Sequence, residues 1–139
     1  MRRLLGQLST RSPAPDDDLL QRVIDAPSVH LLIAVDDDDR CVGMLSLVLT
    51  PLPTGVRGRI EDVVVDRAAR GRGAARLLVR HALRMASEAG ARDVDLTARP
   101  GRTEAVGLYR SLGFARRDTD VYRMIPEPAL NRRGTVDYG

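Results

Sequence analysis

The most constraining feature of this 139-residue chain is a strand, a glycine-containing turn and a long helix that follow one another directly. The run R-I-E-D-V-V-V at residues 59–65 is rich in β-branched side chains and predicts a buried strand. Gly71 and Gly73 lie in the turn. Residues 74–89 place small and apolar side chains on one face and arginines on another, which predicts an amphipathic helix. Such a unit belongs in a sheet with helices packed on it.

The turn before this helix is a candidate anion site. The first N–H groups of a helix have no partner within the helix, and glycines allow a phosphate to approach the backbone. Arg70 and Arg72 add positive charge there. A Walker-type loop is excluded because the chain contains no lysine, and the dinucleotide fingerprint is excluded because Arg76 replaces its third glycine. On these residues alone, an ordinary tight turn remains an equal alternative.

Periodicity and turn residues divide the rest of the chain into further elements, in the order α-α-β-β-β-α-β-α-β. The sequence predicts an α/β (α+β) fold in which helices cover both faces of a mixed sheet of five to six strands. One domain is expected over residues 1–125, followed by an irregular tail over 126–139. The other predicted elements are a helix at Leu4–Leu8, a helix after the aspartates at 16–18, hairpin strands at 29–35 and 41–50, a strand at 93–97, a helix from Thr103 to Leu112, and a last strand that begins at Phe114 and is completed by 121–125.

Composition excludes several classes of function. Net charge is only +3, and one Phe, three Tyr and no Trp leave little for stacking nucleic-acid bases. No apolar run reaches the roughly 20 residues that a membrane-spanning helix needs. One cysteine, Cys41, with His30 and His81, is a poor basis for a metal site, and the aspartate run at 36–39 is typical of a solvated hairpin turn rather than of a calcium loop. We therefore expect a cytoplasmic protein without a metal.

Two motifs resemble those of the GNAT superfamily of N-acetyltransferases. The segment R-G-R-G-A-A at residues 70–75 matches the pattern Arg/Gln-x-x-Gly-x-Gly/Ala, with which that family binds the pyrophosphate of acetyl-CoA. The segment A-V-G-L-Y-R-S-L-G-F at residues 105–114 resembles the family's second signature, A-x-x-L-Y-x-x-x-G-F. The motifs occur in the expected order, and the similarity extends over about residues 19–125.

The resemblance implies that acetyl-CoA is a cosubstrate, bound where the strand at 59–65 and the strand at 93–97 run parallel and splay apart. The pantetheine arm would then pair with the open edge of the first of these strands. Arg102 stands where the family often has an asparagine that touches the cofactor. The residues that the resemblance assigns to acetyl-CoA binding are Val63, Val64, Val65, Arg70, Gly71, Arg72, Gly73, Ala74, Ala75 and Arg102.

Two side chains are candidates for proton transfer. Glu61, on the predicted strand, corresponds to a position where many relatives carry a general base, and an ion pair with an arginine is an equal alternative. Asp62 points to the other face of a regular strand, unless a bulge exchanges the two. Tyr109 matches the family's general-acid tyrosine, although it can also serve as a half-buried aromatic.

The predicted activity is therefore acetyl transfer to a primary amine by direct attack. An acetyl-CoA-binding module with little or no activity is the alternative. The family usually begins with a strand ahead of its first helix, whereas Leu4 already starts a helical pattern here. We expect either that the native chain starts upstream or that the strand at 29–35 is an exposed edge, through which the protein could form a homodimer.

Overall fold

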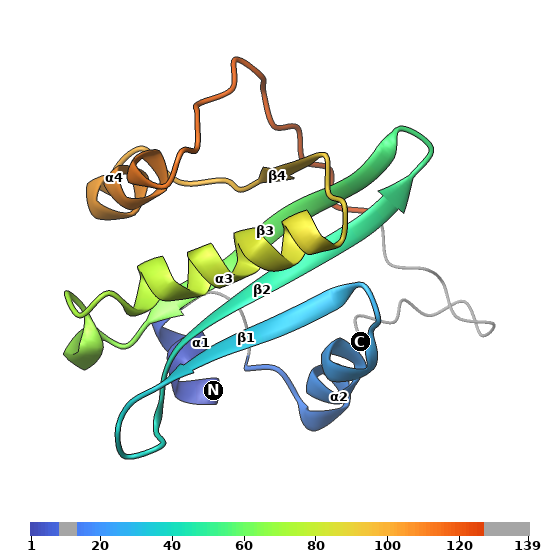
Figure 1. Cartoon of the computed structure of the whole chain (residues 1–139). Coiled ribbons are helices and arrows are strands. Elements are labelled where there is room, and N and C mark those ends of the chain that lie inside the picture. Colours follow the sequence, from blue (N-terminus) through green and yellow to red (C-terminus); the bar gives the residue numbers. More distant parts are fainter. Residues whose placement is uncertain (9–13, 127–139) are drawn as a thin grey trace.

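The computed structural model describes residues 1–8 and 14–126, which form a twisted sheet with helices packed on it (Figure 1). The predicted order of the elements holds up to the last helix. In chain order they are α1 (Arg2–Leu8), α2 (Asp17–Asp25), β1 (Val29–Val35), β2 (Cys41–Leu52), β3 (Gly55–Val65), the 3-10 turn η1 (Arg67–Ala69), α3 (Ala74–Glu88), β4 (Asp93–Asp95) and α4 (Thr103–Ser111).

The sheet has the strand order β1-β2-β3-β4. β1, β2 and β3 form an antiparallel meander, and β4 runs parallel to β3 after the crossover through α3. The pairing of β3 with β4 covers only residues 57–59 against 93–95. β1 lies at the edge of the sheet, which was one of the two alternatives in the sequence analysis.

The prediction of a last strand was wrong, and the sheet has four strands rather than five or six. Within residues 114–126 no strand forms, and Val121, Tyr122, Met124 and Ile125 are 74–90% exposed. The physical reason is the short outer strand: β4 spans three residues and offers few backbone groups to a further strand.

Helices cover both faces of the sheet, as predicted. On one face, α3 contributes Leu78, Val79 and Ala82 to a core with Leu45 and Leu47 of β2. On the other face, α1 inserts the fully buried Leu4 against Met44 of β2 and Val64 of β3. Figure 1 shows α3 lying across the sheet and α1 behind it.

A β-bulge interrupts β3 before its end. Ser46 of β2 faces Glu61, whereas Met44 faces Val64, so that Asp62 and Val63 together oppose the single residue Leu45. Asp62 takes the left-handed conformation at φ 54°, which is uncommon for a residue with a side chain. The bulge that the sequence analysis considered is therefore present, and it shifts the alternation of side chains at this end of the strand.

Candidate active site

A small pocket lies where β3 and β4 diverge. Their backbone pairing ends after Arg59 and Asp95, and the next residues of each chain segment form the walls of the pocket. Its volume is about 110 Å³. It is lined by Leu8, Ile60, Glu61, Asp62, Val63, Leu96, Thr97, Arg102 and Tyr109. Four residues predicted from the sequence, Glu61, Val63, Arg102 and Tyr109, are thus brought together in one place.

Glu61 lines the pocket and is also paired with an arginine. Its Oε1 accepts from Nε of Arg59, two residues earlier on β3. Both side chains are about half exposed, at 42% and 46%, so solvent screens this pair and it contributes little to stability. The structure therefore shows the arginine partner that one of the two alternatives predicted, and it also places Glu61 at the wall of the pocket.

Tyr109 reaches the pocket from α4. Its ring packs edge-on against Phe114, with the ring centroids 5.8 Å apart. Burial raises the pKa of the Tyr109 phenol above its ordinary value, and the positive charge of Arg102 offsets part of that effect. The phenol is consequently protonated at neutral pH and is able to donate a hydrogen bond or a proton.

Asp62 also lines the pocket, although in a regular strand its side chain would point to the opposite face from Glu61. The bulge allows it to line the same pocket as Glu61. Partial burial of its carboxyl raises the pKa of Asp62, and the negative charge of Glu61 raises it further. The only sequence signal for it is the adjacent pair of carboxylates ahead of the valine run, which does not by itself locate a bulge.

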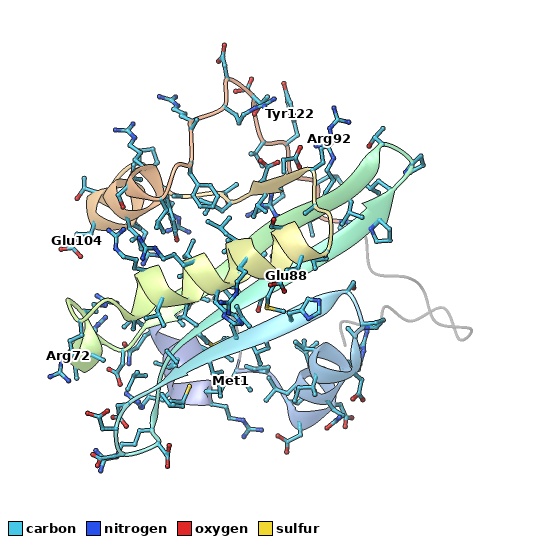
Figure 2. All side chains as sticks on the ribbon, in the orientation of Figure 1. Met1, Arg72, Glu88, Arg92, Glu104 and Tyr122 are labelled. Atoms are coloured by element: carbon cyan, nitrogen blue, oxygen red, sulfur yellow. The ribbon has the colours of Figure 1, made fainter. Side chains whose placement is uncertain are left out.

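The turn before α3 has the geometry of an anion cradle. Gly71 and Gly73 have φ values of 78° and 85°, and a Cβ built on either would meet nothing within 4 Å. Gly73 is the N-cap of α3 and offers no side-chain cap to the first turn of the helix. Arg72 lies at the exposed tip of the turn (Figure 2). Such a turn presents free backbone N–H groups and open space to a phosphate.

The other predicted cofactor residues lie at the end of β3, before the cradle, and at the start of α3, after it. Val64 is buried against α1, so only its backbone is available to a ligand. The carbonyl of Val65 accepts from Nε of Arg70 at 3.2 Å, which closes the turn on itself. Ala74 and Ala75 form the start of α3. Beyond Arg59, the edge of β3 that faces away from β2 has no strand partner in the described part of the chain.

Besides Ile60 and Asp62, sequence reasoning missed three residues that line the pocket. Leu8 of α1 lines the pocket although it is distant in sequence from β3, and Leu96 and Thr97 line it because β4 ends before them.

Within residues 1–8 and 14–126, no helix combines the length and apolar character that crossing a bilayer requires.

Comparison with known proteins places this chain in a family. Residues 3–114 match the Acetyltransferase (GNAT) family. Mycothiol acetyltransferase from Renibacterium salmoninarum is 32% identical over 97 residues, which cover 68% of this chain and 29% of that protein. Glucosamine 6-phosphate N-acetyltransferase 1 from Oryza sativa subsp. japonica is 30% identical over 128 residues, 85% of this chain and 74% of the relative.

A solved structure has the same fold. AAC(6')-Iy in complex with the bisubstrate analog CoA-S-monomethyl-acetylneamine superposes with a TM-score of 0.74 at 21% identity, over 90% of this chain and 88% of that one. The chain spans less than a third of the first of the two sequence relatives. The family match covers most of the chain, from the first helix to the end of the second motif. This protein therefore belongs to the GNAT family of acetyltransferases.

Proposed function

We propose that this protein transfers the acetyl group of acetyl-CoA to a primary amine by direct attack. The observation that carries the proposal is the pocket at the divergence of β3 and β4, which lies on the same strand that leads into the anion cradle before α3. A reaction pocket joined to a phosphate site by one open strand edge suits a long thioester with a pyrophosphate in its middle.

The described residues fit acetyl-CoA as a cosubstrate. Gly71 and Gly73 leave open space beside backbone N–H groups, and Arg70 and Arg72 are exposed next to them. The unpaired edge of β3 over residues 60–65 supplies backbone groups for the amides of a pantetheine arm. Bound acetyl-CoA supplies the activated acetyl group, and the residues of this chain position it and move the protons.

Glu61 is proposed as the proton acceptor for the incoming amine. A lysine-like amine has a pKa near 10.4, so only about one molecule in 10³ is neutral at pH 7 and its deprotonation costs about 4.6 kcal/mol. A carboxylate at the pocket wall lowers this cost by accepting the proton directly or through water. Asp62 adds a second negative group on the same wall, which favours a cationic acceptor.

Tyr109 is proposed as the proton donor to the departing thiolate. Its phenol lines the pocket and stays protonated because burial raises its pKa. A backbone N–H among Val63, Val64 and Val65 would stabilise the negative charge that develops on the carbonyl oxygen. Arg102, which also lines the pocket, would hold the cosubstrate from the side of α4.

The decisive experiment is a calorimetric titration of acetyl-CoA into the purified protein and into the variant Arg70→Ala/Arg72→Ala. The matched control is Arg22→Ala/Arg92→Ala, which removes the same charge from exposed positions on α2 and beside β4, away from the cradle. Micromolar binding that is lost only in the first variant supports the cofactor site. Wild-type protein that is folded and binds no acetyl-CoA contradicts the proposal.

The acceptor requires a second assay, in which CoA release is followed with a panel of amines that includes glucosamine 6-phosphate, named for one relative. Turnover with at least one amine distinguishes an enzyme from an acetyl-CoA-binding module. The ion pair of Glu61 with Arg59 is the observation that favours the module, because Arg59 occupies an oxygen of the carboxylate that would have to accept the proton.

We also propose that the protein is cytoplasmic and that residues 1–125 act as one acetyltransferase domain. The proposal also includes a homodimer formed through the edge strand β1, where Ile33 and Val35 are 55% and 54% exposed. Replacement of Ile33 by Lys adds a charge that disfavours edge pairing. Sedimentation that shows a dimer for the wild type and a monomer for Ile33→Lys supports this arrangement, and a monomeric wild type contradicts it.

A further inference from the structure

Helix α1 is attached to the turn that leads from β3 into the anion cradle. Asp66 follows β3 directly, is only 8% exposed and N-caps η1 by accepting from the N–H of Ala68 at 3.2 Å. From α1, Arg3 is paired with Asp66 Oδ2, and Gln7 Nε2 donates to Asp66 Oδ1 at 3.4 Å. Gln7 Oε1 also accepts from the N–H of Arg67 at 3.1 Å.

These contacts form a defined set, the α1 clamp, which consists of Arg3, Gln7, Asp66 and the N–H of Arg67. Gln7 is the central member, because its amide uses its donor and its acceptor on two successive residues of the turn. Such a two-point contact fixes both the position and the direction of the backbone that continues into the cradle.

The clamp is separate from the contacts that hold α1 to the sheet. Leu4 is fully buried against Met44 and Val64 on the opposite face from α3. That apolar contact involves neither Gln7 nor Asp66. Loss of the Gln7 amide therefore leaves α1 docked and changes only how the turn is held.

An anion cradle made of backbone N–H groups depends on the placement of its chain. Besides the clamp, Asp66 N–H donates to Val42 O at 2.8 Å, whereas the bonds that follow it along the chain stay within the turn: Ala69 N–H to Asp66 O at 2.8 Å and Arg70 Nε to Val65 O at 3.2 Å. A turn that is not fixed in advance must be ordered when the ligand binds, and this ordering weakens affinity.

We infer that Gln7 and Asp66 are positioning residues for the phosphate-bearing half of CoA, through which α1 sets the affinity of the cradle before α3. The inference rests on the proposed binding of acetyl-CoA. It predicts a selective effect: loss of the clamp weakens ligands that carry the pyrophosphate and spares those that bind only along β3.

The test compares two variants of the clamp with a matched glutamine. Gln7→Ala and Arg3→Ala each remove one arm of the clamp from α1. Gln21→Ala is the control, because Gln21 is exposed on α2 and its Nε2 donates to Oδ1 of Asp25 in its own helix, at 2.9 Å. Dissociation constants are measured by calorimetry for CoA and for 3′-phospho-ADP, and by competition for pantetheine, which lacks both phosphates of the pyrophosphate.

We expect Gln7→Ala to weaken CoA and 3′-phospho-ADP by about 5- to 10-fold, as the loss of one to two hydrogen bonds implies, and to leave pantetheine within about twofold. Gln21→Ala should leave all three within about twofold. CoA binding that is unchanged in folded Gln7→Ala and Arg3→Ala overturns the inference, and so does an equal loss for pantetheine and CoA. A wild type that binds no CoA contradicts the proposed function itself, which is a different result.

Discussion

The contact between β3 and β4 supports a quantitative prediction, because a single glycine allows it. Gly58 faces Val94 at the middle of the three-residue parallel ladder. A Cβ built on Gly58 would lie 2.9 Å from Val94 Cγ2 and 3.3 Å from the carbonyl oxygen of Asp93. A real Cβ essentially never lies within 3.0 Å of another heavy atom, so Gly58→Ala must displace β4 or the Val94 side chain.

The expected cost follows from overpacking. Forcing a methyl group into a packed site costs about 1–3 kcal/mol, and the loss of unfolded-state entropy on replacing glycine returns about 0.4–1 kcal/mol. Gly58→Ala should therefore destabilise the fold by about 1–2 kcal/mol. For a domain of this size, this corresponds to a fall in Tm of about 4–8 °C. Val94 cannot easily turn away, because its branched side chain has few rotamers.

The control is Gly107→Ala in α4, where an added Cβ meets nothing within 4 Å. Alanine is the better helix former by about 0.8–1 kcal/mol, so this variant should raise Tm. Thermal unfolding followed by circular dichroism measures both variants. A Gly58→Ala protein as stable as the wild type would refute the close packing of β4 on β3.

A double-mutant cycle with Val94→Ala identifies the responsible contact. Removal of Val94 Cγ2 removes the shortest contact of the new Cβ, so Gly58→Ala should cost at least about 1 kcal/mol less in the Val94→Ala background. Additive effects of the two substitutions would show that the cost arises from the backbone of β4 instead.

Three further predictions concern the site. Tyr109→Phe should lower kcat by about 10²-fold, as expected for the loss of a general acid, and should change the affinity for acetyl-CoA by no more than about twofold. The control Tyr122→Phe, at a position that is 90% exposed, should leave both kcat and affinity unchanged. The pKa of Asp66 is lowered by hydrogen bonds from Arg3, the N–H of Ala68 and Gln7. Its carboxylate therefore stabilises the fold above pH 4, and this stabilisation is lost as the pH falls through the lowered pKa. The Tm of Asp66→Asn should be below that of the wild type at neutral pH, and the difference should shrink below pH 4. Burial and the negative charge of Glu61 raise the pKa of Asp62, so ionisation of the Asp62 carboxyl destabilises the fold near neutral pH. Asp62→Asn should therefore have a higher Tm than the wild type at pH 7, and the difference in Tm should shrink toward pH 4.

Local signals predicted the elements that depend on neighbours in sequence. The helix expected at 74–89 is α3 over Ala74–Glu88, because its glycine boundaries and apolar face are all encoded within about 17 residues. The hairpin strands at 29–35 and 41–50 correspond to β1 and β2 for the same reason, with β2 extended to Leu52. The pocket residues Glu61 and Tyr109 were predicted from the resemblance to the GNAT family rather than from geometry.

Features that depend on distant residues could not be predicted in this way. An apolar run at 121–125 has the pattern of a strand, but pairing requires an available edge, and β4 provides only three residues. The contact of Gln7 with Asp66 joins positions 59 apart in the chain, and neither residue carries a local signal for it. The bulge at Asp62 depends on the register of β2 against β3, which the composition of one strand does not determine.

The irregular features of the sheet are the ones that create the site. A longer β4 would pair with β3 beyond Arg59 and close the pocket, and a regular β3 would direct Asp62 away from Glu61. A non-glycine residue in the left-handed region costs about 1–3 kcal/mol and persists only where the surrounding structure imposes it. Glycine would adopt φ 54° at Asp62 without that cost, so conformation alone does not account for a carboxylate at this position. The proposed function offers a reason for it, because a second negative group on the pocket wall would attract an amine that arrives protonated.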